Sequence, residues 1–122
     1  MADLPEPVAN DDSRPLDINL VGQSPHVFAY RMWYRRHDDA DWSEFAAGDT
    51  EDDVPDHNPT GPHPDGTQIV MNVAIGGKPN STFRFVVTFG QGGQVVQGGT
   101  FVRTGKTGAN GGAGRKLTVI LV

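Results

Sequence analysis

Residues 26–37, HVFAYRMWYRRH, contain the clearest β-strand pattern in the chain. Side chains of a strand alternate between its two faces, so every second residue shares a face. One face of this segment is aromatic and apolar: Phe28, Tyr30, Met32 and Tyr34. The other face carries a tryptophan between arginines: Ala29, Arg31, Trp33 and Arg35. The segment is therefore predicted to be a strand with one face in a core and the other near solvent.

The same alternation recurs on both sides of this segment. It predicts strands over Leu16–Val21, Thr67–Ile75 and Thr82–Phe89. Shorter strands are predicted at Trp42–Ala47, Gln94–Gln97, Thr100–Arg103 and Leu117–Val122. No segment has a helical period, and 16 glycines with 9 prolines suit short strands joined by turns. The prediction is an all-β fold: a single antiparallel β-sandwich, immunoglobulin-like or jelly-roll-like, with a small β-barrel as the alternative.

A length of 122 residues predicts one domain. Residues 1–15, with three prolines and four acidic residues, are predicted to form a flexible N-terminal arm before a sandwich domain over residues 16–122. Residues 48–66, GDTEDDVPDHNPTGPHPDG, lack hydrophobic periodicity and are predicted to be a long loop. The glycine-rich segment Gly105–Gly114 is predicted to be a flexible hairpin loop.

Composition excludes several classes of protein. The chain has no cysteine, which excludes disulfides, thiolate metal sites and cysteine nucleophiles. No apolar run approaches the roughly 20 residues of a membrane-spanning helix, so no membrane insertion is expected. The first residues lack the basic and apolar regions of a Sec signal peptide. The predicted locations are the cytoplasm, a virus particle or export by a route other than Sec.

Charge is divided along the chain. Residues 1–65 contain all 15 acidic residues and 4 of the 10 basic ones, a formal charge of −11. Residues 66–122 contain the other 6 basic residues and no acidic one, a formal charge of +6. Such a chain neutralises its charge either within one fold or between copies of the fold. Six dispersed basic residues make a weak phosphate footprint, so nucleic acid is not a predicted partner.

The aromatic segment supplies the candidate binding residues: Trp33, Trp42, Arg31, Arg35 and Tyr34. A half-exposed tryptophan beside arginines can stack on a sugar ring or anchor a protein interface. The alternative is a structural tryptophan, with the arginines paired to the aspartates at positions 38, 39 and 41.

Residues 49–56, which we call the acidic loop, are part of the predicted loop over residues 48–66. They supply a candidate Ca²⁺ site made of Asp49, Glu51, Asp53 and Asp56. The EF-hand pattern is incomplete, because Val54 stands where that loop needs glycine. The alternative is a solvated acidic loop that binds no metal. No other cofactor is predicted.

The sequence gives little support for catalysis, although an enzyme that uses loop carboxylates or the pair His57 and His63 is a third hypothesis. None of the four serines lies in a G-x-S-x-G turn, and Gly99–Thr107 lacks the spacing of a phosphate-binding loop. The predicted function is a non-enzymatic structural or protein-interaction module that self-associates through charge-complementary faces into a homo-oligomer. The alternative is a small carbohydrate-binding protein, assisted by Ca²⁺, that uses Trp33, Trp42 and the acidic loop.

Overall fold

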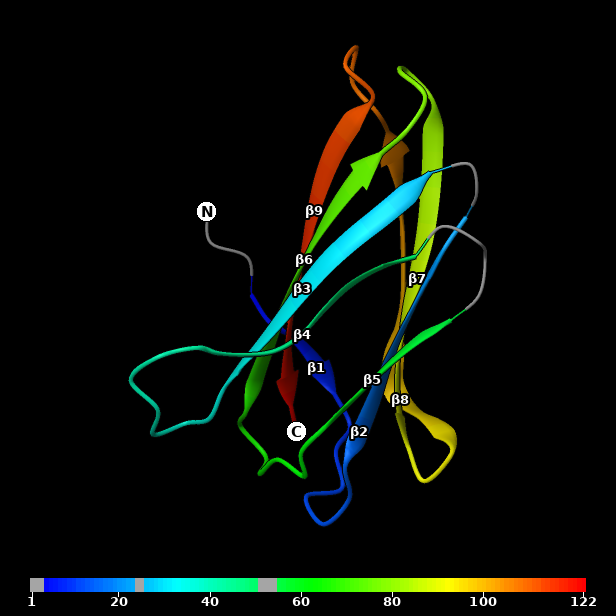
Figure 1. Cartoon of the computed structure of the whole chain (residues 1–122). Coiled ribbons are helices and arrows are strands. Elements are labelled where there is room, and N and C mark those ends of the chain that lie inside the picture. The colour runs from blue at the N-terminus through cyan, green and yellow to red at the C-terminus, as the bar shows by residue number, and fades with distance from the viewer. Residues whose placement is uncertain (1–3, 24–25, 51–54) are drawn as a thin grey trace.

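The computed structural model describes residues 4–23, 26–50 and 55–122, and these residues form strands, turns and loops without a helix. Figure 1 shows the strands as two layers. Their bounds are β1 Glu6–Val8, β2 Leu16–Gly22, β3 Val27–Arg35, β4 Ser43–Thr50, β5 Asp56–Thr60, β6 Gln68–Gly76, β7 Thr82–Gln91, β8 Gln94–Lys106 and β9 Gly112–Leu121. The described part of the chain thus holds no helix that could cross a membrane.

The strands pair into a five-stranded sheet, in the order β1-β9-β6-β3-β4, and a four-stranded sheet, in the order β5-β2-β7-β8. Every pairing is antiparallel except that of β1 with β9. The two sheets pack face to face and do not close on each other, which confirms the predicted β-sandwich and excludes the barrel alternative.

The strand order differs from that of a plain immunoglobulin sandwich. The neighbours β3, β6 and β9 correspond in place to strands C, F and G of that fold. In the immunoglobulin fold F and G follow each other in the chain, whereas here the hairpin of β7 and β8 intervenes. That hairpin pairs with β2 in the other sheet.

Alternate residues of every long strand fill the space between the sheets. In β2 the buried positions are Leu16, Ile18 and Leu20, and in β3 they include Phe28, Tyr30 and Met32 as predicted. The ring of Phe28 lies 5.6 Å from that of Phe85, so the aromatic core joins the two sheets. This burial leaves the other face of β3, with Trp33, toward solvent.

The N-terminal segment is more ordered than the sequence indicates. A flexible arm is predicted over residues 1–15, but Glu6–Val8 forms β1 and pairs with Val119–Leu121 of β9. Val8 is fully buried, and the backbone N–H of Ala9 donates to Gln97 O at 3.0 Å. The sequence does not predict this strand for two reasons. Prolines lie on either side of Glu6, and a three-residue edge strand needs no hydrophobic pattern.

The predicted loop over residues 48–66 also contains structure. Strand β4 continues to Thr50, and Asp56–Thr60 forms β5 against β2. Because β5 is an edge strand exposed on one side, a polar sequence with Pro59 is compatible with it.

Glycines inside β8 and β9 do not end those strands. The two short strands predicted around Gly98 and Gly99 are one strand, Gln94–Lys106, whose register with β7 shifts at Thr88. Gly98 has a φ of 75°, which suits an irregularity of the strand rather than a chain reversal. The predicted loop Gly105–Gly114 is correspondingly shorter, with strand up to Lys106 and again from Gly112.

Candidate functional site

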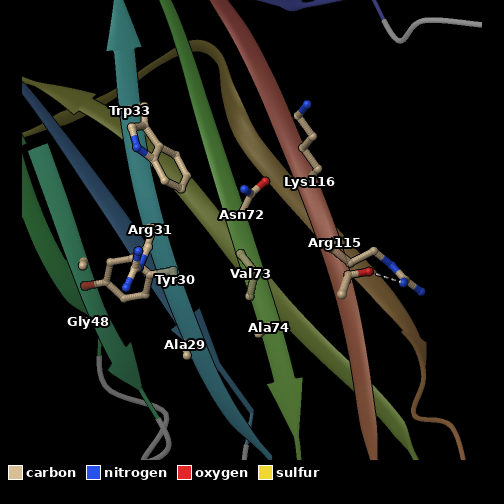
Figure 2. Close-up of a pocket in the computed structure, with 12 residues that line it drawn as sticks. Ala29, Tyr30, Arg31, Trp33, Gly48, Asn72, Val73, Ala74, Arg115 and Lys116 are labelled. Atoms are coloured by element: carbon tan, nitrogen blue, oxygen red, sulfur yellow. Dashed lines mark hydrogen bonds between the residues drawn. The ribbon is translucent and has the colours of Figure 1, made fainter. Parts of the chain in front are cut away.

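The solvent-facing side of the five-stranded sheet brings together residues that lie far apart in the sequence. Cross-strand register places Arg31 beside Asn72, and Asn72 beside Lys116. The neighbouring row on one side is Ala29, Ala74 and Gly114, and the row on the other side is Trp33, Val70 and Thr118. Figure 2 shows Arg31 and Trp33 on one strand, Asn72 and Ala74 on the next, and Lys116 on the third. We call this surface, together with Trp42, the tryptophan face.

The tryptophan face is hollowed. An open depression of about 790 Å³ lies over the small side chains of Ala29 and Ala74 and over Gly114. Trp33, Arg31 and Lys116 line the same depression. The hollow exists because consecutive positions of one cross-strand row carry at most a methyl group, while the next row carries long side chains.

A second, smaller hollow of about 300 Å³ adjoins the first and shares Trp33, Asn72 and Lys116 with it. Trp42, in the connection between β3 and β4, lines this second hollow. The Arg35 guanidinium lies 4.9 Å from the centre of the Trp42 ring, a cation–π distance. The structure thus brings four predicted binding residues, Trp33, Trp42, Arg31 and Arg35, to one surface.

Tyr34 lies elsewhere. Its ring packs on the opposite side of β3, 4.6 Å from the ring of His63 and 5.9 Å from that of Phe45. The alternation of β3 places it there, since Tyr34 follows Trp33 directly. Tyr34 is therefore a packing residue and not part of the tryptophan face.

The arginines of the face are largely free of carboxylates. Arg31 lies 3.9 Å from Glu44, and both side chains are exposed, so this ion pair is weak. Within the described residues, neither Arg31 nor Arg35 forms an ion pair with an aspartate of the 38–41 segment. The predicted alternative, in which those aspartates neutralise the arginines, is therefore not the arrangement in this structure.

The predicted Ca²⁺ ligands are not assembled in the part of the chain that the structure describes. Glu51 and Asp53 lie outside the described residues. Asp49 lies on the solvent-facing side of β4, opposite Ala29, whereas the Asp56 carboxylate accepts a hydrogen bond from the Tyr30 hydroxyl at 3.1 Å. The described residues contain no group of three or more metal-binding side chains, so the calcium site stays a prediction from the sequence.

The fold separates His57 and His63, the two histidines of the predicted loop over residues 48–66. His57 is exposed on β5, with Nδ1 2.9 Å from Asp17 Oδ2. His63 is only 2% exposed, and its Nε2 lies 2.8 Å from Thr60 Oγ1. They form no joint site.

A serine and a histidine that the sequence did not connect lie together at one end of the sandwich. His26 Nε2 lies 2.7 Å from Ser81 Oγ, and the Ser81 hydroxyl donates to the Lys78 carbonyl at 2.6 Å. Because the Ser81 hydroxyl donates its hydrogen to that carbonyl, its oxygen accepts a hydrogen bond from the Nε2–H of His26. The pair holds the turn after β6 against the buried His26. It is a structural contact.

Several residues of the tryptophan face cannot be identified from the sequence alone. Asn72, Ala74 and Lys116 carry no motif, and each is an ordinary exposed position of its own strand. Only the register of β3, β6 and β9 places them beside Trp33. Their one signal is the alternation that marks them as outward-facing.

No known protein family, no curated protein and no solved structure matches this chain.

Proposed function

We propose that this protein is a non-enzymatic binding module whose tryptophan face binds an oligosaccharide, with acidic sugars preferred. The observation that carries the proposal is that Trp33 lines both a hollow with a small-residue floor and an adjoining hollow that Trp42 also lines. Indole rings present a flat apolar face with a polar N–H, which suits the C–H face and hydroxyls of a sugar ring.

The shape of the surface supports an extended ligand. The two hollows share three lining residues, so they lie side by side on the sheet. Their volumes, about 790 and 300 Å³, lie near the range of small-ligand sites. The floor of Ala29, Ala74 and Gly114 lets a ring approach the backbone closely while Trp33 contacts its side.

Polar groups of the face support a ligand that carries carboxylates. Arg31 and Lys116 flank Asn72 in one cross-strand row. The amide of Asn72 can donate and accept hydrogen bonds with hydroxyls, and the two cations favour a uronate carboxylate. A surface open to water also argues for binding without catalysis, because catalytic sites exclude water from the reacting groups.

Isothermal titration calorimetry tests this proposal. The full-length protein is titrated with galacturonate oligomers of three to six units and with the corresponding galactose oligomers. We expect saturable binding of the acidic series and weaker binding of the neutral one. Trp33→Ala should weaken binding about tenfold or more, because the stacking surface is lost.

A second variant fills the hollow instead of removing a contact. Ala74→Phe places a ring on the floor, and at an exposed strand position it should leave the melting temperature unchanged while abolishing binding. Val102→Ala, on the exposed surface of the other sheet, is the matched control and should bind like the parent. The proposal fails if neither oligomer series binds, or if both variants at the tryptophan face bind like the parent.

A further inference from the structure

The two halves of the chain occupy opposite lateral sides of the sandwich. In the five-stranded sheet, β3 and β4 lie on one side and β6 and β9 on the other. In the four-stranded sheet, β2 and β5 lie on one side and β7 and β8 on the other. Contacts of β4 with β5 and of β1 with β8 fix which edges of the two sheets coincide. Strands β2–β5 therefore form one side, and strands β6–β9 form the other.

This arrangement turns the division of charge along the sequence into a division in space. Residues 66–122, which include β6–β9, carry six basic residues and no acidic one. Strands β2–β5 carry four acidic residues and two basic ones, namely Asp17, Glu44, Asp49 and Asp56 with Arg31 and Arg35. The molecule has an acidic side, with the edge strands β4 and β5, and a basic side, with the edge strand β8. Only β1, from the acidic half, crosses to the basic side.

Ion pairs within the molecule neutralise little of this separation. Among the described residues, the ion pair that joins the two halves of the chain is Arg103 with Glu6, at 3.9 Å. It exists because β1 carries Glu6 to the basic side. Two other ion pairs of the described residues lie within the first half, Arg14–Asp11 and Arg31–Glu44.

Each side offers an edge strand with unpaired backbone groups. On the acidic side β4 carries Glu44 and Asp49, while the shorter β5 contains Pro59, which lacks an N–H. On the basic side, β1 contacts β8 around Gln97 and, through Glu6, at Arg103. The end of β8 beyond that contact carries the exposed Lys106. An edge strand is a template for another strand, and its charges decide which strand it accepts.

We propose that β4 of one copy of this protein docks against β8 of a second copy. Two β4 edges repel each other, and so do two β8 edges, whereas β4 against β8 pairs acidic with basic side chains. Such a contact is heterologous, so copies add head to tail into rings or open chains. On its β4 side this interface borders the tryptophan face, since Gly48 lines the hollow and Glu44 lies beside Arg31. Its β8 side lies on the other sheet. The interface gives the self-association predicted from the charge pattern a specific location.

Light scattering coupled to size-exclusion chromatography tests this interface in the full-length protein. The parent should form concentration-dependent oligomers in 50 mM NaCl and monomers in 1 M NaCl, where screening shortens the range of charge interactions to about 3 Å. The β4 variant, Glu44→Lys with Asp49→Lys, should be monomeric, because both of its edges are basic. The β8 variant, Arg103→Glu with Lys106→Glu, should be monomeric, because both of its edges are acidic.

Mixing separates the proposal from a general effect of net charge. An equimolar mixture of the β4 and β8 variants should assemble again, since each then offers the other a complementary edge. The matched control, Asp12→Lys with Asp38→Lys, changes the charge as much as the β4 variant does but in connecting segments, and should still assemble. A parent that stays monomeric at every concentration and salt, a mixture that stays monomeric, or a control as monomeric as the β4 variant would each overturn the proposal. Sugar binding by the monomeric β8 variant should be unchanged, so the two proposals fail independently.

Discussion

Tyr30 links the two sheets on the acidic side of the sandwich. Its side chain belongs to the core between the sheets. Its hydroxyl lies 3.1 Å from Asp56 Oδ2 and 3.2 Å from Asn58 Oδ1, both on β5. Burial, with the charge of Asp56, raises the pKa of this phenol above its usual value. The hydroxyl is therefore a protonated donor at neutral pH, and it holds β5 against the five-stranded sheet.

We expect Tyr30→Phe to lower the free energy of unfolding by about 1–2 kcal/mol, because a hydrogen bond to a carboxylate is lost from a partly buried site. Urea denaturation followed by circular dichroism measures this change. Tyr34→Phe is the matched control, since the contacts of Tyr34 within the described residues are ring contacts. Equal stability of both variants would contradict the assigned role of Tyr30.

His63 makes the stability of the fold depend on pH. Burial, and to a lesser degree the nearby Arg36, lower the pKa of this imidazole below 6.5. Nδ1 of His63 has no hydrogen-bond partner within the described residues, so no acceptor there receives the additional N–H that a protonated ring carries. The unfolded chain then binds a proton more readily than the folded one, and folding is favoured where the ring is neutral in both states.

The expected outcome is that stability is constant above about pH 7 and falls as the pH drops through the unfolded value near 6.5. Melting temperatures between pH 5 and 8 measure it. His63→Gln should flatten this part of the profile, although it lowers stability overall. An unchanged profile in His63→Gln would show that another group carries the pH dependence.

Strand β1 is the element whose contribution was least expected. It closes the side of the sandwich between β9 and β8, and it buries Val8 completely. Deletion of residues 1–9 should lower the free energy of unfolding by about 2–4 kcal/mol, through loss of one buried valine and its strand pairing. Deletion of residues 1–4, which precede β1, is the control and should change it little. If the two deletions changed the free energy of unfolding equally, the stabilising role of β1 would be contradicted.

How far sequence predicts the elements depends on whether a strand buries a face. Strands β2, β3, β6 and β7 each alternate over at least seven residues, and the pattern located all four. Strand β5 has little buried surface, and its pattern of partial exposure leaves no periodic signal in DHNPT. Glycines caused the opposite error. Gly98 and Gly99 predict a break between two strands, but they lie within β8. Edge strands and irregularities need the partner strand to be recognised.

At the scale of the whole molecule, sequence supplied the parts of the site but not their arrangement. The outward direction of Trp33, Arg31 and Arg35 follows from alternation in β3 alone. The hollow does not, because Ala29, Ala74 and Gly114 become neighbours only through pairing of three strands. Likewise, the division of charge at residue 65 is visible in the sequence. Only the strand order shows that the two halves lie on opposite sides of the sandwich.

Binding at the tryptophan face is tested most directly by the indole N–H signals in a ¹H–¹⁵N NMR spectrum. The chain contains two tryptophans, Trp33 and Trp42, so these two signals report on this face alone. Titration with a galacturonate tetramer should shift both signals saturably, and Ala74→Phe should remove the shifts. Indole signals that stay unmoved at millimolar tetramer would contradict binding at this surface.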